Sequence, residues 1–156
     1  MSINAKEFTL SRVNPDRVST DPVSNTVADD WQFLCGGEAF DRDINNNFNS
    51  RRKLKDCQDR TSKVVDEKNF TGRTVSLSIS GTIENTAAGR WLLELARSDN
   101  PVLEDARVYL PGIEYMRGDF AIGNFKDTAS DLDGNVTFSA TLDSSGDTVF
   151  TTIALA

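Results

Sequence analysis

Two segments of the chain alternate between apolar and hydroxyl-bearing residues with a period of two. Residues 73–80 read RTVSLSIS, and residues 136–142 read VTFSATL. Because successive side chains of a β-strand point to opposite faces, this pattern predicts two strands with one apolar face and one face of small hydroxyls. Such a face accepts water but does not hold charged molecules, which favours a smooth wall over a catalytic pocket. The hydroxyl-bearing positions are Ser76, Ser78, Ser80, Thr137, Ser139 and Thr141.

Other segments also have the composition of strands. Trp31 and Phe33 share a face of the first one, and Gly36 with Gly37 is typical of a bulge or a bend. The last two are separated by Pro111-Gly112, which indicates a turn. We therefore predict further strands at residues 28–40, 104–110 and 113–126.

One segment, residues 85–98, has the period of an amphipathic helix. Asn85 can accept hydrogen bonds from the free amides of the first turn, and Pro101 prevents the helix from continuing. A single helix among strands most simply packs its apolar face over the sheet, so we expect a mainly β (α+β) architecture. The residues at helical spacing on that face are Ala88, Trp91, Leu92 and Leu95.

Two polar segments flank the first predicted strand. Residues 1–27 contain few large apolar residues and two prolines, and we interpret them as an extended N-terminal arm, with a disordered tail as the alternative. Residues 41–63 are polar and Asn-rich, and we predict a long hairpin loop there. Its basic cluster consists of Arg51, Arg52, Lys53, Lys55, Arg60 and Lys63.

This basic cluster has three interpretations. It could be a solvated hairpin tip, a nucleic-acid patch or a surface that docks onto an acidic part of an identical subunit. The net charge of −7 opposes nucleic-acid binding, and residues 101–156 carry nine acidic and only three basic side chains. Opposite charges at the two ends of one chain favour head-to-tail association of identical copies.

The composition excludes several kinds of site. The chain of 156 residues fits one domain plus extensions, and it contains no histidine, which removes the common catalytic triads and the commonest zinc ligand. Two cysteines, Cys35 and Cys57, are too few for a disulfide scaffold. No apolar run is long enough to cross a bilayer, and the N-terminus lacks the apolar core of a secretory signal. We expect no enzyme activity, cofactor or metal, and synthesis in the cytosol.

The order of these elements resembles that of the tail tube (major tail) proteins of tailed bacteriophages. The resemblance covers residues 28–154, from a Trp-containing strand through a polar hairpin, an SLSISG strand, a short helix and a P-G turn to the last strand pair. Its most specific part is G-x-x-x-I-x-x-F followed by V-x-F-S-x-T-L-x-x-S-G. The matching residues are Gly118, Ile122, Phe125, Val136, Phe138, Ser139, Thr141, Leu142, Ser145 and Gly146.

The resemblance implies a β-sandwich or barrel-like domain over residues 28–156 with one flanking helix. It also implies hexameric rings that stack into a hollow tube, through which phage DNA passes without specific binding during ejection into the host. The hydroxyl rows become candidates for the lumen wall, and Arg51, Arg52, Lys53, Lys55 and Arg60 become candidates for contacts with a neighbouring ring. Cys57 and the Asn-rich part of the loop match no feature of the family.

The implied setting is the virion tail, assembled in the cytoplasm of the bacterial host. The implied partners are further copies of the chain, the tape measure, the tail tip or baseplate, the terminator and, where the tail is contractile, a sheath. The alternative function is a monomeric β-sandwich module that binds glycans or a host surface. Such a module would need an exposed aromatic platform, for which Trp31 and Tyr115 are the candidates.

Overall fold

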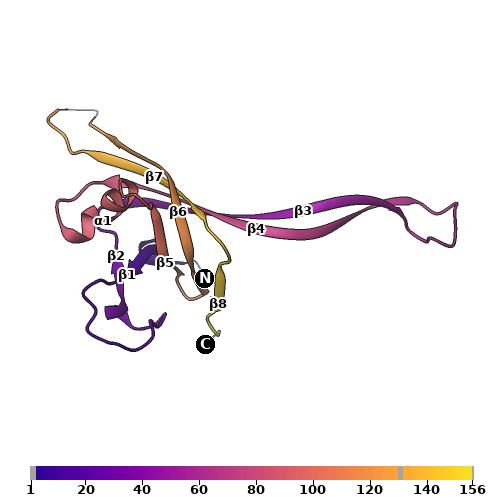
Figure 1. The fold of residues 1–156 in the computed structure, drawn as a ribbon, viewed down its shortest axis with the longest axis horizontal. Helices are drawn as coiled ribbons and strands as arrows, with labels where there is room; N and C mark the ends of the chain where they lie inside the picture. The colour runs from indigo at the N-terminus through magenta and orange to yellow at the C-terminus, as the bar shows by residue number, and fades with distance from the viewer. Residues whose placement is uncertain (1–2, 130–131, 156) are drawn as a thin grey trace.

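The computed structural model describes residues 3–129 and 132–155, which form one antiparallel sheet with one α-helix (Figure 1). The strand order is β2-β1-β5-β6-β7-β4-β3, and β8 also pairs with β6. In chain order the elements are the 3₁₀-helix η1 (Ala5–Glu7), β1 (Thr9–Val13), the 3₁₀-helix η2 (Ala28–Asp30), β2 (Trp31–Phe33), β3 (Gly37–Leu54), β4 (Val64–Thr82), α1 (Ala87–Ala96), β5 (Val102–Leu110), β6 (Glu114–Thr128), β7 (Thr137–Ser144) and β8 (Val149–Thr152).

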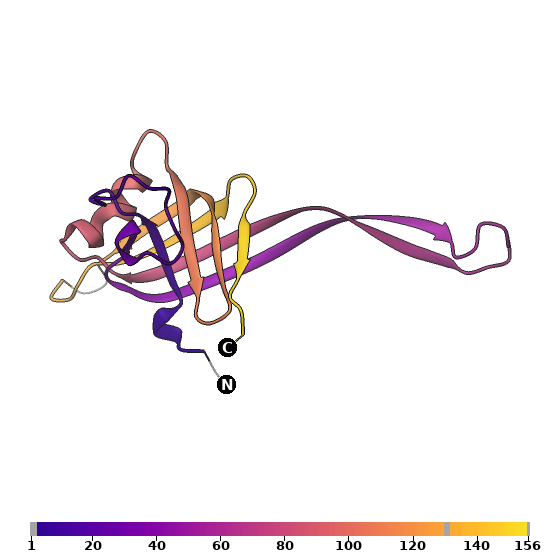
Figure 2. The same cartoon turned by 90° about the horizontal axis from the view of Figure 1, so that it is seen from below.

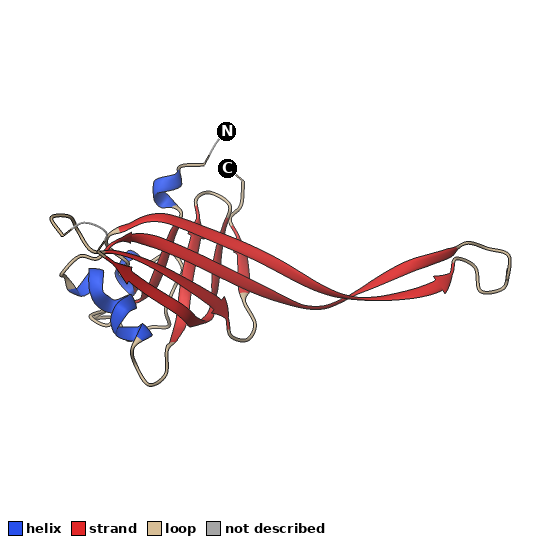
Figure 3. Ribbon diagram, turned by 90° about the horizontal axis from the view of Figure 1, so that it is seen from above, coloured by secondary structure: helices blue, strands red, loops and turns tan. Residues whose placement is uncertain are grey.

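The sheet folds over itself along β6, because this strand has different neighbours along its length. β6 pairs with β8 through residues 114–117 and with β7 through residues 120–128, while β5 lies along its other edge. In Figure 3, the long hairpin of β3 and β4 crosses in front of β5, β8 and the part of β6 that pairs with them. The apolar faces of the two layers meet in one core. This arrangement confirms the prediction of a mainly β fold with one helix.

The core takes its residues from the strands with the clearest alternation. Val75, Leu77 and Ile79 of β4 are buried, as are Phe138, Ala140 and Leu142 of β7, so the two hydroxyl-patterned strands have the faces that we predicted. Burial of each large apolar side chain stabilises the fold by about 1.5–3 kcal/mol. The buried residues of the other layer and the helix are Leu10, Trp91, Leu92, Leu103, Ala106, Val108, Met116, Phe120 and Ile122.

The predicted helix is present, with shorter bounds than residues 85–98. It runs over Ala87–Ala96, and its N-cap is Thr86, whose side chain accepts a hydrogen bond from the amide of Gly89 at 3.1 Å. Asn85 is therefore not the cap, because the threonine one residue later has the extended backbone that a cap requires. Trp91 and Leu92 are fully buried, and Ala88 and Leu95 are partly buried, on the face that packs against β5 and β6.

The prediction that residues 1–27 form an arm is wrong in part. Strand β1 pairs with β2 on one side and with β5 on the other, and Leu10 is buried in the core. The five-residue strand has too little alternation to be recognised, since its position depends on pairing with residues about a hundred positions away. The rest of the segment, residues 14–27, is an irregular loop that hydrogen bonds from Arg107 and Arg117 attach to the sheet.

The single strand predicted at residues 28–40 is also wrong. The chain turns at Gly36, which has a φ of +92°, so β2 is short and β3 begins anew at Gly37. Gly36 lies against Thr82 at the end of β4. A Cβ on Gly36 would overlap the carbonyl of Thr82, and the amide of Thr82 donates a hydrogen bond of 2.9 Å to the carbonyl of Gly36. Trp31 is buried while Phe33 is 46% exposed, so these side chains do not share an environment.

The loop predicted at residues 41–63 is a strand over most of its length. β3 continues to Leu54 and pairs with β4 from Gly37↔Gly81 to Leu54↔Val64, so the connecting loop comprises only residues 55–63. Figures 1 and 2 show this hairpin projecting far beyond the body. The Asn-rich sequence has low intrinsic β propensity, and pairing with β4 overrides it.

Candidate functional site

The hydroxyl rows of β4 and β7 lie side by side on the outer face of the sheet. The register of the two strands places Ser78 opposite Thr141 and Ser80 opposite Ser139, and all four side chains are exposed or partly exposed. Ser76 is opposite Asp143 and donates a hydrogen bond of 2.7 Å to its carboxylate, while Thr137 is opposite Thr82. The six predicted hydroxyls therefore form one continuous surface.

β3 extends this surface with carboxylates from the segment that we predicted to be a loop, residues 41–63. Asp41 is opposite Ser78, and Asp43 is opposite Ser76, so both carboxylates lie on the hydroxyl-bearing face beside Asp143 of β7. On the other side Lys126 of β6 is opposite Ser139 and adds one positive charge. We call this four-strand surface the hydroxyl–carboxylate face. The alternation of Asp41, Asp43, Asn45 and Asn47 was the signal that could have found it.

The predicted basic cluster lies in the outer part of the projecting hairpin, where its charges are partly balanced. The Nε atom of Arg51 and the Nζ atom of Lys53 lie 2.9 Å and 3.3 Å from the Glu67 carboxylate on the opposite strand. Arg52 lies 3.8 Å from Asp66. Hydrogen bonds from Lys53, which has the larger effect, and from Arg51 lower the pKa of Glu67. Because water and salt screen such exposed pairs, they contribute little to stability.

Lys55 and Arg60 belong to the turn that closes the hairpin. The amide of Lys55 donates to the carbonyl of Lys63 at 2.8 Å, which continues the ladder by one more pair. Within the turn, the carboxylate of Asp59 accepts hydrogen bonds from the hydroxyl and the amide of Thr61, and these bonds lower the pKa of Asp59. The structure thus places Arg51 and Lys53 together on one face of the paired strands, Arg52 on the other face, and Lys55 and Arg60 at the tip.

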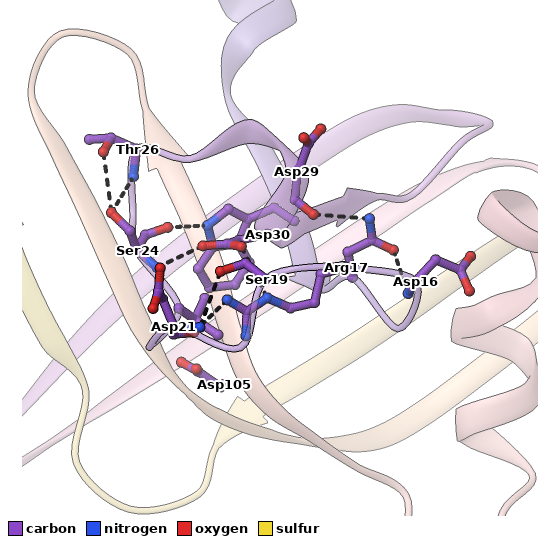
Figure 4. A network of polar contacts seen from close by, with 12 residues as sticks. Asp16, Arg17, Ser19, Asp21, Ser24, Thr26, Asp29, Asp30 and Asp105 are labelled. Atoms are coloured by element: carbon purple, nitrogen blue, oxygen red, sulfur yellow. Dashed lines mark hydrogen bonds and ion pairs between the residues drawn. The ribbon is translucent and has the colours of Figure 1, made fainter.

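A polar network fastens the irregular loop of residues 14–30 to the sheet (Figure 4). Asp30 is 3% exposed, and its two carboxylate oxygens accept hydrogen bonds from the amide of Ser24 and from Nε of Arg17, each at 3.0 Å. These hydrogen bonds lower the pKa of Asp30, and the bond from the Ser24 amide has the largest effect. The indole of Trp31 donates to the carbonyl of Ser24 at 2.7 Å, so the loop is held at several points.

Two arginines from the sheet complete this attachment. Arg107 donates to the carbonyl of Asn25 at 2.6 Å, and Arg117 donates to the carbonyl of Val23 at 3.1 Å. Their guanidinium carbons lie 4.9 Å and 5.1 Å from the ring of Trp31. Burial lowers the pKa of Arg107, whose charge is compensated by carbonyl oxygens and aromatic rings.

We predict that substitution Asp30→Asn destabilises the fold at neutral pH and that this difference shrinks in acid. The pKa of Asp30 is lowered in the folded state, so its ionised form adds stability above the ordinary value of 3.8, and that stability is lost as the pH falls through the lowered pKa. Urea midpoints of both proteins, measured from neutral pH to below 3.8, test this. Asp29→Asn, which removes the same charge at an exposed neighbour, is the control. A difference between Asp30→Asn and the unsubstituted protein that does not change with pH would contradict the prediction.

The described residues contain no group of three metal-ligating side chains, and Cys35 and Cys57 are both exposed and unbonded. No helix in the described part of the chain is long and apolar enough to span a membrane. Trp31 and Tyr115, the candidates for a glycan platform, are engaged elsewhere: Trp31 is buried, and the Tyr115 ring stacks on that of Tyr109 at 4.9 Å.

No protein-family model and no curated protein sequence matches the chain. Among solved structures, a chain from the tail of the empty gene transfer agent particle superposes with a TM-score of 0.66 at 15% identity, covering 96% of this chain and 99% of that chain. The chain has the fold of a tail tube protein.

Two other structures with this tail tube fold are similar. A chain from the virion of the native gene transfer agent particle has a TM-score of 0.65 at 15% identity, with coverage of 96% of this chain and 99% of that chain. The SPP1 tail tube protein has a TM-score of 0.59 at 12% identity, with coverage of 98% and 81%. The likeness extends over nearly the whole chain.

Proposed function

We propose that this chain is a structural subunit of a phage-type tail tube, which assembles into rings that stack around a channel for DNA. The observation that carries the proposal is the likeness in fold to tail proteins over 96–98% of the chain. The structure of the empty gene transfer agent tail has C6 symmetry, and we propose the same hexameric ring here. The subunit acts as a virion component assembled in the host cytoplasm, together with the other proteins of the tail.

The hydroxyl–carboxylate face has the chemistry of a channel wall for DNA. Asp41, Asp43 and Asp143 repel phosphates, and the small hydroxyls between them keep the wall hydrated. The strand positions that form this face contain no aromatic residue on which a base could stack. Among the residues named on this face, Asp41, Asp43 and Asp143 outnumber Lys126, so the wall mainly repels DNA and offers it no stacking surface, which is the property that a conduit requires.

Free strand edges support association side by side. In the sheet of the described residues, β2 and β3 are the end strands, and one edge of β8 is also unpaired. Exposed edges are templates for pairing with another chain, and closing a sheet into a ring of subunits removes them. We propose that β3 contributes to the inner wall, and that the basic residues of the hairpin, chiefly Lys55 and Arg60 at its tip, contact the next ring.

Electron microscopy of the concentrated, purified protein tests the proposed function. We expect rings and hollow tubes, which shorten as the salt concentration rises because the contacts between rings include exposed charges. A second sample, seeded with preformed tail tips, removes any requirement for an initiator. A protein that stays monomeric in both samples would contradict a tube function. Binding of the monomer to a glycan array would then favour the alternative binding module.

A further inference from the structure

The projecting hairpin carries an apolar stripe on the face opposite the cluster of Arg51, Lys53 and Glu67, and the exposed Arg52–Asp66 pair interrupts this stripe. The stripe consists of Ile44, Phe48, Leu54, Val64 and Phe70, and it continues the core-facing side of β3 and β4 beyond the body. Ile44 is 40% exposed, Phe48 is 53% exposed and Phe70 is 54% exposed. The rings of Phe48 and Phe70 lie opposite each other with their centroids 5.8 Å apart, so they form one aromatic rung.

Beyond the body, no other strand of the described chain pairs with the hairpin, and the guanidinium of Arg73 lies 5.4 Å from the centroid of the Phe70 ring. Within the body, β4 pairs with β3 on one edge and with β7 on the other, and the pairing with β7 extends only from Ser76 to Thr82. From Ser76 toward the tip of the hairpin, β3 and β4 pair only with each other. An isolated two-stranded hairpin is at best marginally stable in water, and it needs packing on one face to be ordered. A stripe that repeats the pattern of the core face, without a covering layer, indicates an interface.

The body contains an apolar groove at the other end of the same strand. The groove has a volume of about 540 Å³ and lies between β1 and the beginning of β3, lined by Phe8, Leu10, Phe33, Leu34, Phe40 and Ile79. Phe8 and Phe40 meet edge to face at 4.8 Å and form one wall. This volume lies within the range of roughly 300–1,000 Å³ that holds drug-sized apolar groups, so the groove can accept an aromatic rung.

The charges around the two surfaces are complementary. Residues 44–73 carry eight Lys and Arg side chains against four Asp and Glu side chains, a net charge of +4, while the rest of the chain has a net charge of −11. The rim of the groove carries the exposed carboxylates Glu38 and Asp41 and one ammonium group, Lys6. A positive hairpin is therefore attracted to the negative body of another copy, and this attraction orients it before the apolar surfaces meet.

We propose that the apolar stripe of one subunit docks into the β1–β3 groove of a second copy, with the Phe48–Phe70 rung as its anchor. This inference rests on the proposed tube function and identifies the contact that holds neighbouring subunits together. Phe40 in the groove and Phe48 on the stripe lie eight residues apart on β3, roughly 26 Å at the rise of an extended strand. Each copy thus donates at one end and accepts at the other, which makes the contact heterologous and able to repeat.

Disulfide trapping between two variants tests the contact. Both variants carry Cys35→Ser and Cys57→Ser; one adds Ser50→Cys next to the rung on the stripe side of β3, and the other adds Ala5→Cys at the groove. Mixed tubes should give a disulfide between the two variants that unassembled protein does not give. Asn49→Cys, on the opposite side of the same strand, is the matched control and should not cross-link to Ala5→Cys.

A second variant measures the contribution of the rung to assembly. Phe48→Ser with Phe70→Ser should reduce tube yield at least tenfold while leaving the thermal midpoint of the monomer nearly unchanged, because both rings lie outside the core. Unimpaired tubes of this variant, or equal cross-linking of Ser50→Cys and Asn49→Cys, would overturn the docking proposal and leave the tube function intact. Failure of the unsubstituted protein to form any tubes would overturn both.

Discussion

A shortened chain, in which an Asn-Gly dipeptide replaces residues 47–72, is expected to fold normally and to form no tubes. The replacement joins Asn46 and Arg73, which face each other in the ladder of β3 and β4. Asn-Gly is the preferred two-residue connection for such a pair because both residues tolerate the positive φ of a type I′ turn. The result is a body with its own short hairpin, which keeps Ile44 but lacks the Phe48–Phe70 rung, the outer part of the stripe and the basic tip.

The body should retain its stability because the deleted residues contribute nothing to its core. Val75, Leu77 and Ile79 remain in place, and none of the buried core residues lies between positions 47 and 72. Shortening the connection also lowers the entropy cost of closing it, although this term changes by only about 0.6 kcal/mol for each twofold change in loop length. We expect a thermal midpoint close to that of the full chain.

Assembly should change completely, since each subunit then accepts a neighbour but donates none. Size-exclusion chromatography and electron microscopy of the shortened chain should show monomers or single rings at concentrations at which the full chain forms tubes. Added in small amounts to the full chain, the shortened chain should cap growing ends and reduce tube length. Tubes of normal length from the shortened chain alone would show that the hairpin has no part in stacking.

The parts of the fold that the sequence predicted are those with long, uninterrupted periodicity. Strand β4 over Val75–Ile79, strand β7 and helix α1 each repeat one pattern for several residues, so local sequence suffices to identify them. β1 and the outer part of β3 depend on distant partners. β1 lies between residues of β2 and β5, and the Asn-rich run of β3 is extended because β4 pairs with it.

The candidate site divides in the same way. The hydroxyl rows follow from alternation alone, but their union into one surface requires the antiparallel register that places Ser78 beside Thr141. Asp41 and Asp43 join that surface only because β3 is a strand. The basic cluster was recognised by composition, whereas its pairing with Glu67 depends on which residue lies across the hairpin. Pairings across strands are long-range facts that a single sequence does not contain.

Replacing Trp91 by alanine is expected to remove most of the stability of the fold. The side chain is 1% exposed and lies at the centre of the helix face that covers the core. Truncation of a buried tryptophan costs about 3–5 kcal/mol through lost transfer energy and an unfilled cavity. Domains of this size have a total stability of roughly 5–15 kcal/mol, so the variant should be close to its unfolding threshold.

Trp91 also connects the helix to the edge of the sheet. Its indole Nε1 donates a hydrogen bond of 3.3 Å to the carbonyl of Phe33, and the guanidinium of Arg12 lies 5.1 Å from its ring. Trp91→Phe keeps most of the apolar volume and loses this hydrogen bond, so it should cost less than the alanine variant, with the bond itself contributing about 0.5–1.5 kcal/mol. Comparing the two substitutions separates packing from hydrogen bonding.

Urea denaturation of the monomer measures these differences, with Arg90→Ala as the control on the exposed side of the same helix. Arg90 lies 3.4 Å from Glu94 in an exposed pair, and its loss should change stability by less than about 0.5 kcal/mol. A cost below about 1 kcal/mol for Trp91→Ala would mean that the helix is not needed to close the core.

The expected large cost has a consequence for assembly. A core that is opened beneath α1 exposes the apolar faces of strands, so Trp91→Ala should give amorphous aggregate, whereas the shortened chain stays soluble.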